Sequence, residues 1–279
     1  MKYIFIFFTL TFTALSQSAW HPAEGEYNFS LSQVVDSYDE FYRGADRRDY
    51  PFGEFHQHST FLSGEYGISD KLAVDFTIGY TYTEATDKHP PTGIDNDSGM
   101  SDTRIGLRYQ LVNEFLADEF YMPTVSLRIG LILEGTYDTG FPAAAGDGGN
   151  GFETSIHIGK VFGDTGFGFE GSFGYRNRNQ DIPDEIYGGI NFFYSCFNDK
   201  LVLYTGYDFQ KSLHGMDIGD PGFTYKRFHE TQEISHNLQY GLHYYITEKL
   251  GIGLTFAHTI DGRNTGIKRS LALTMTYSF

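Results

Sequence analysis

Most of the chain alternates between apolar residues and polar or small residues with a period of two. In the clearest segment, residues 72–82, apolar or aromatic side chains occupy every second position from Leu72 to Tyr82. Successive side chains of a β-strand point to opposite faces, so this period predicts an extended strand with one apolar face and one polar face. Residues 102–111 and 125–133 repeat the pattern, and Ile132 is the one exception.

Twelve segments of this kind follow one another along the chain. The first two are less regular, because in the second of them His56, His58 and Leu62 compete with Phe55 and Phe61 for the apolar face. An even number of strands is typical of bacterial outer-membrane barrels. The predicted strands cover residues 29–41, 55–66, 72–82, 102–111, 125–133, 152–158, 167–175, 186–194, 201–209, 238–246, 250–256 and 271–279.

The aromatic residues of these segments fall into two groups, one at each end of the strands. Two aromatic girdles flanking an aliphatic belt are typical of a barrel in a membrane, and a soluble sandwich has no reason to sort its aromatic residues in this way. One group is Tyr109, Tyr194, Tyr244, Tyr277 and Phe279, and the other is Tyr80, Tyr82, Tyr175, Tyr207 and Phe209.

The connections between the segments alternate between short and long. Tight turns are expected at residues 69–71, 163–165, 198–200 and 247–249, and longer stretches at 44–53, 84–101, 135–151, 177–184 and 212–227. Outer-membrane barrels pair tight periplasmic turns with long external loops, so this alternation supports the same prediction. Two connections deviate, since 112–120 is long for a periplasmic turn and 261–264 is short for an external loop.

The two ends of the sequence point to export and membrane insertion. Residues 1–18 combine a charged start, a short apolar core and small residues before a predicted cleavage site after Ser18, which is the pattern of a signal peptide. We therefore expect a signal peptide at residues 1–18 and a single barrel domain at residues 19–279. The last segment ends in Phe279, and this terminal aromatic residue resembles the signal that passes barrels to their insertion machinery.

Composition excludes several other classes of protein. The net charge of −16 would repel phosphates, so a nucleic-acid partner is not expected. A single Cys can form neither an internal disulfide nor a Cys-based zinc site, and no cofactor or metal site is predicted. The expected location is the outer membrane, and the expected partners are its lipid, its lipopolysaccharide, the insertion machinery and a small-molecule solute.

The polar faces of the strands supply the candidate functional residues. Twelve strands close to a backbone radius of about 12 Å, which leaves room for a narrow pore or one small ligand. Charges inside are expected to pair across the lumen or to keep water, and Arg104, Arg108 and Arg128 form a candidate positive ladder. The candidates are Asp75, Arg104, Arg108, Arg128, Glu134, Glu153, His157, Glu170, Arg176, Tyr187, Asn191 and Asp208.

An enzymatic barrel that acts on envelope lipid is the main alternative. Such enzymes use a Ser nucleophile within hydrogen-bond reach of a His base, and the nearest pair in the sequence is His58 and Ser59. Adjacent residues of a strand point to opposite faces, so these two side chains do not meet easily. No catalytic residues are therefore assigned. A closed barrel whose external loops bind a partner is a further alternative.

Residues 101–111, 148–160 and 173–178 with Asp184 and Glu185 carry a family resemblance, because Gly and Arg recur at fixed places in their alternating strands. In these segments the chain resembles the outer-membrane transporters named after the phenol meta-degradation pathway. The resemblance implies an all-β transmembrane antiparallel barrel of the outer-membrane type. It also implies a channel for passive passage of a small solute, aromatic or otherwise apolar.

Overall fold

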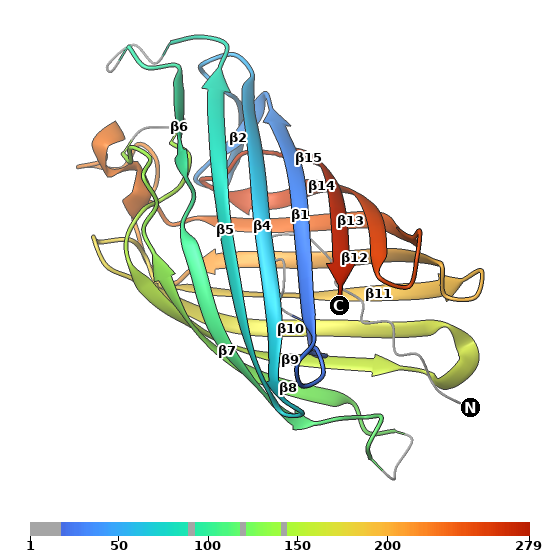
Figure 1. The fold of residues 1–279 in the computed structure, drawn as a ribbon. Helices are drawn as coiled ribbons and strands as arrows, with labels where there is room; N and C mark the ends of the chain where they lie inside the picture. Colours follow the sequence, from blue (N-terminus) through green and yellow to red (C-terminus); the bar gives the residue numbers. More distant parts are fainter. Residues whose placement is uncertain (1–17, 89–92, 118–120, 141–143) are drawn as a thin grey trace.

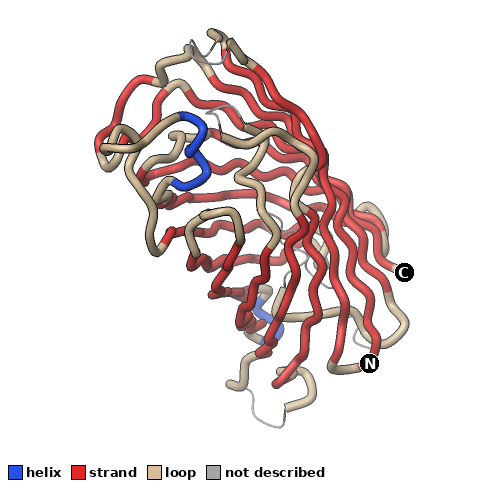
Figure 2. Tube along the Cα trace, turned by 90° about the vertical axis from the view of Figure 1, so that its left-hand side faces the viewer, coloured by secondary structure: helices blue, strands red, loops and turns tan. Residues whose placement is uncertain are grey.

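The computed structural model describes residues 18–279 apart from 89–92, 118–120 and 141–143 (Figure 1). The predicted signal peptide lies outside the described residues, except for Ser18. Two short 3-10 helices, η1 (Gly163–Thr165) and η2 (Tyr225–Glu230), lie at opposite ends of the molecule (Figure 2). Among the described residues, no helix is long and apolar enough to cross a membrane.

The strands follow the predicted segments and extend most of them by a few residues. They are β1 (Tyr27–Tyr38), β2 (Glu40–Arg43), β3 (Asp46–Asp49), β4 (Phe55–Ser69), β5 (Leu72–Ala85), β6 (Asn96–Met100), β7 (Thr103–Val112), β8 (Thr124–Leu133), β9 (Gly151–Val161), β10 (Phe167–Arg178), β11 (Glu185–Cys196), β12 (Leu201–Ser212), β13 (Ile234–Tyr245), β14 (Leu250–Arg263) and β15 (Arg269–Ser278).

The main sheet closes on itself, because β1 pairs with β4 on one side and with β15 on the other. Successive wall strands pair antiparallel, and β6 and β7 pair with successive stretches of β5, so together they occupy one position in the wall. The wall is therefore a closed barrel of twelve strands. Figures 1 and 2 show the strands curving round a common interior. Closure pairs the first wall strand, β1, with the last, β15, and a hydrocarbon environment favours such a closed sheet. The sequence prediction of twelve strands is confirmed.

The register places the two faces of each strand as the alternation predicts. On β7, Leu107 is 44% exposed on the outside of the barrel, whereas its neighbour Arg108 is fully buried inside. The structure also settles the two irregular strands, where Leu31 and Leu62 face outward and Ser32 and Ser59 face the lumen. The barrel thus carries an aliphatic belt outside and a polar lumen inside, which is the arrangement of a membrane barrel.

Glycines on the inner face give aromatic rings room to lie flat against the wall. A Cβ on Gly174 of β10 would lie 2.4 Å from the Tyr187 ring, and one on Gly241 of β13 would lie 2.3 Å from the Tyr204 ring. Any larger residue at these positions would push the ring off the neighbouring strand. The small residues of the polar face are therefore part of the packing of the lumen.

The two ends of the barrel differ as the connections predict. At the end with short turns, Phe197, Asn198 and Asp199 take left-handed backbone angles in the tight turn between β11 and β12. The Phe279 ring lies 5.1 Å from Tyr27 at this same end. At the other end the long connections carry η2 and the β2–β3 hairpin, a hairpin that the sequence analysis had taken as loop. The chain thus has a periplasmic end and an elaborated external end.

Candidate functional site: the barrel lumen

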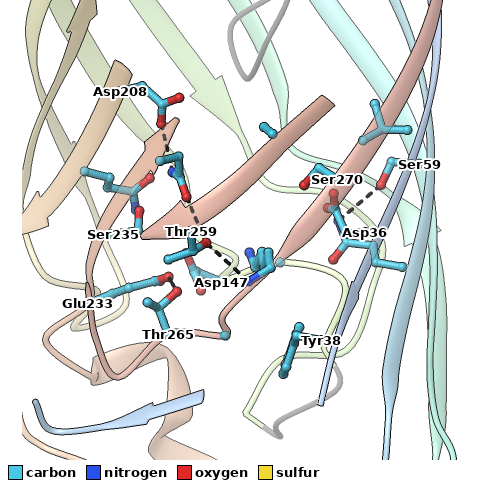
Figure 3. Close-up of a pocket in the computed structure, with 18 of the residues that line it drawn as sticks. Asp36, Tyr38, Ser59, Asp147, Asp208, Glu233, Ser235, Thr259, Thr265 and Ser270 are labelled. Atoms are coloured by element: carbon cyan, nitrogen blue, oxygen red, sulfur yellow. Dashed lines mark hydrogen bonds between the residues drawn. The ribbon is translucent and has the colours of Figure 1, made fainter. Parts of the chain in front are cut away.

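The lumen contains a cavity of about 1150 Å³ that reaches the external loops. Its wall combines inward side chains from strands around the barrel with residues of the external loops. Figure 3 shows part of this wall, where Asp36, Ser59 and Asp208 come from different strands and Glu233 comes from a loop. Seven of the residues predicted from the sequence line the cavity: Arg104, His157, Glu170, Arg176, Tyr187, Asn191 and Asp208.

A second group of predicted residues is packed rather than solvated. Arg128 holds Asp75 with two nitrogens at 2.7 and 3.0 Å and donates to Glu153 at 2.6 Å. On the same inner surface, Arg108 pairs with Glu65. All five side chains are fully or almost fully buried. Buried charges are tolerated in a protein when they are paired and hydrogen-bonded, and these residues meet both conditions.

This ion-pair network continues toward the cavity through Arg176. Its guanidinium lies 3.4 Å from Glu153 and 3.0 Å from Glu185, and it sits 4.8 Å above the centre of the Tyr187 ring. The arginines predicted as a positive ladder do share the lumen. Arg108, Arg128 and Arg176 nevertheless face carboxylates at close range, so they form a neutralised network and not a free positive stripe.

Glu134 is a correction to the sequence analysis. It was assigned to the lumen by extending the alternation of β8, but β8 ends at Leu133 and Glu134 is exposed in the loop that follows. Its carboxylate accepts a hydrogen bond of 2.8 Å from the side chain of Gln180 in another external loop. The alternation between faces holds only while the chain is extended, and it fails at the first loop residue.

Residues 18–22 lie inside the lumen on the periplasmic side, mostly buried against the wall, and we call this segment the plug. Trp20 is buried, its indole N–H donates to Glu114 at 2.9 Å, and its ring meets Phe193 edge-on at 6.2 Å. Ser126 donates to the carbonyl oxygen of Ala19 at 2.6 Å. The sequence analysis missed the plug. A possible signal was the single Trp of the chain, which stands in the short stretch between the predicted cleavage site and the first strand.

Aromatic side chains surround the external part of the cavity. Tyr38, Phe41, Tyr50, Phe52 and Phe55 pack together, with ring centres 4.7 Å apart for the Tyr38 and Phe55 pair and 5.4 Å apart for the Tyr50 and Phe52 pair. Tyr225 of η2 extends this mouth cluster, 6.5 Å from Phe52. All six rings line the cavity. The sequence analysis treated residues 44–53 as an external loop and did not single out the aromatic residues around it.

Polar side chains form a chain of hydrogen bonds across three strands below the mouth. Asn237 donates to Asp208 at 2.9 Å, and Thr259 donates to Asn237 at 2.8 Å, as Figure 3 shows. On the loop side, Thr265 donates to Glu233 at 2.6 Å, and burial raises the pKa of Glu233 to about 7. Glu233 therefore changes charge near neutral pH at the external side of the cavity.

One Ser and His pair does meet inside the barrel. Ser155 and His157, two residues apart on β9, are joined by a hydrogen bond of 2.8 Å between Oγ and Nε2. A catalytic His needs a third group to orient its other ring nitrogen. Within the part of the chain that the structure describes, Nδ1 of His157 has no hydrogen-bond partner. The pair thus lacks the third group of a hydrolase site.

Comparison with solved structures identifies the class of fold. The chain resembles the crystal structure of an outer-membrane channel from Pseudomonas putida F1, with a TM-score of 0.71, 13% identity, and coverage of 92% of this chain and 97% of that one. It also resembles the NanC porin, with a TM-score of 0.51, 11% identity, and coverage of 89% and 98%. The fold is that of an outer-membrane β-barrel. No protein-family model matches the sequence, and no curated protein matches it.

Proposed function

We propose that this protein is an outer-membrane channel that lets a small aromatic or apolar solute pass without energy coupling. The observation that carries the proposal is the cavity of about 1150 Å³, entered past a cluster of aromatic rings and enclosed by a wall that faces lipid. Aromatic faces bind apolar and aromatic molecules by stacking, while the polar lumen behind them keeps the path wet. Passage into the periplasm requires the plug to shift.

Further features of the barrel support the expected location in the outer membrane and bear on the two alternative functions. An aliphatic belt between two rows of aromatic residues fits the outer membrane, with its lipid and lipopolysaccharide as surroundings. The solved structure similar to this chain is named an outer-membrane channel, and the phenol meta-degradation resemblance implies a small solute. An enzyme acting on envelope lipid has less support, because the Ser155 and His157 pair lacks an orienting group among the described residues. A closed barrel that binds a partner through its loops is the remaining alternative.

Transport is tested with the purified protein in planar bilayers and in liposomes. We expect small ionic conductance and uptake of simple aromatic solutes, such as phenol and toluene, above that of empty liposomes. Saturation of uptake at rising solute concentration would indicate a binding cavity. Absence of both conductance and uptake, with the barrel correctly folded, would contradict the proposal and favour a closed barrel.

The contribution of the mouth cluster is tested by the double variant Phe52→Ala and Tyr225→Ala. Aromatic contacts contribute about 0.5–1.5 kcal/mol each beyond the area they bury, so losing both should raise the concentration at half-saturation roughly five- to 150-fold. Phe167→Ala is the matched control, because this ring is 56% exposed on the outer surface at the periplasmic end. If the solute concentration at half-saturation is the same in both variants, the solute binds outside the mouth cluster.

A further inference from the structure

The backbone nitrogen of Ala19 makes a buried contact with a carboxylate. Ala19 is completely buried, and its N–H donates to Oε1 of Glu170 on β10 at 2.6 Å. Glu170 lines the cavity, so this contact lies where the plug meets the floor of the cavity. Ala19 is also the residue that follows the predicted cleavage site, and the peptide nitrogen held by Glu170 is the one that cleavage would free.

Glu170 differs from the other buried carboxylates of the lumen. Glu65, Asp75, Glu114 and Glu153 each have an Arg or Lys nitrogen within 4.0 Å. In the described part of the chain, Glu170 has no such partner, although it is only 6% exposed. A buried carboxylate without a countercharge is costly, so a cation is expected at this position.

We propose that the amino terminus created by cleavage between Ser18 and Ala19 is that cation, and that its ion pair with Glu170 fastens the plug inside the lumen. Hydrolysis by the leader peptidase of the exporting cell adds one water across the peptide bond. The hydroxyl completes the carboxyl group of Ser18 and the remaining hydrogen goes to the nitrogen of Ala19. The carboxyl group then ionises, and the amine takes that proton to become an ammonium. The Ala19 amide and the Ser18 side chain, which both hydrogen-bond Glu170 before cleavage, are thereby replaced by a charged group with three donors.

The rest of the plug holds the new terminus at this place. The carbonyl oxygen of Ala19 is bonded by Ser126, and the Trp20 indole is bonded by Glu114. A Cβ on Gly159 of β9 would lie 2.6 Å from the Trp20 ring, so the segment fits closely against the wall. Arg108 loses the Ser18 carbonyl oxygen as a partner on cleavage and keeps its pair with Glu65. The plug therefore gains its ion pair with Glu170 only after the signal peptide is cleaved.

The first test identifies the terminus of the mature protein. The full chain is expressed in a Gram-negative host, extracted from its outer membrane, and analysed by intact mass and amino-terminal sequencing. We expect the first residue to be Ala19. Any other first residue overturns the proposal, because the ammonium would then lie elsewhere. This readout does not depend on transport, so it is independent of the proposed function.

The second test measures how well the α-amine is protected. The folded protein in detergent is labelled with an amine-reactive reagent, and the α-amine is quantified by mass spectrometry after digestion. We expect Glu170→Gln to be labelled about ten-fold faster than the wild type, the effect of losing about 1.4 kcal/mol of protection. Glu134→Gln is the matched control, because it removes an exposed charge far from the plug and should keep the wild-type rate.

A third variant guards against misfolding of Glu170→Gln. Insertion of one Ala between Ser18 and Ala19 leaves Glu170 intact and moves the ammonium by up to about 3.8 Å along the chain. This variant should also be labelled about ten-fold faster than the wild type. Wild-type labelling rates in both the Glu170→Gln variant and the insertion variant would overturn the ion pair.

Discussion

At the scale of single residues, the lumen shows that position on a strand and the role of a side chain are separate matters. Arg104 and Arg128 were predicted alike from their place in the alternation, yet Arg104 lines the cavity and Arg128 lies between Asp75 and Glu153 in the packed network. What separates them is the identity of the neighbours that barrel closure brings to each one. Loss of a buried arginine that holds two carboxylates takes away the cation of Asp75 and leaves Glu153 with Arg176 alone.

Arg128→Met should therefore destabilise the barrel strongly. Removing the guanidinium leaves Asp75 and Glu153 buried with one fewer cation, and breaking a buried pair in this way costs about 3–5 kcal/mol in the free energy of unfolding. Urea titration of the protein in detergent micelles, followed by tryptophan fluorescence, measures the change. Arg47→Met is the control, because Arg47 and its partner Glu40 are on the exposed β2–β3 hairpin and should give no measurable change. Equal stability of the two variants would mean that the network is not needed.

At the scale of elements, the plug and the β2–β3 hairpin decide what the barrel can do. The plug fills the periplasmic half through contacts with Glu114, Ser126 and Phe193, and the hairpin brings Phe41 to the mouth cluster. Neither element belongs to the wall, and neither has the period of two that predicts wall strands. Both are positioned by side chains of strands that are distant in the sequence.

Deletion of residues 19–22 should open the periplasmic half of the lumen. The wall is a closed sheet that holds itself by its own hydrogen bonds, so we expect the shortened protein to fold and to show several-fold higher single-channel conductance. Trp20→Ala should give an intermediate value, because it removes the largest side chain of the plug. Planar-bilayer recordings measure both variants. If both conduct like the wild type, the plug does not limit the channel.

At the scale of the whole molecule, the barrel separates an apolar outer surface from a charged interior, and it places titratable groups at the external side. Burial raises the pKa of Glu233 to about 7, and its surroundings include Lys268, Asp147 and Glu185 together with the hydroxyl of Thr265. Since the folded pKa lies above the ordinary value of 4.5, the folded state holds this proton longer than the unfolded chain does. The stability from this group is present below about pH 4.5 and is lost as the pH rises through about 7.

The same group should make ion selectivity depend on pH. Above about pH 7 Glu233 carries a negative charge at the external side of the cavity, so the preference for cations over anions should increase from pH 5.5 to pH 8.5. Reversal potentials in a KCl gradient measure this ratio. Glu233→Gln should weaken the pH step while leaving the barrel folded. If the cation preference of the variant changes with pH as much as that of the wild type, groups other than Glu233 cause the change.

Much of the fold was predictable because the barrel is built from local alternation. Outside the first two segments, the strands, their inward and outward faces and the two aromatic rows follow from a local period of two, as in residues 72–82. The structure alone settled the faces of the first two strands. The candidate site was predictable only in part. Parity identified lumen residues such as Glu170 and Arg176 and failed at Glu134, where the strand ends.

The sequence by itself determined the wall, because the face of a strand residue depends only on whether its position is odd or even. The tertiary structure decided which charges pair, that residues 18–22 pack inside the periplasmic part of the lumen, and that six aromatic rings meet at the mouth. These features depend on contacts between residues far apart in the chain. Glu170 and Ala19, 151 positions apart, meet only after twelve strands have closed.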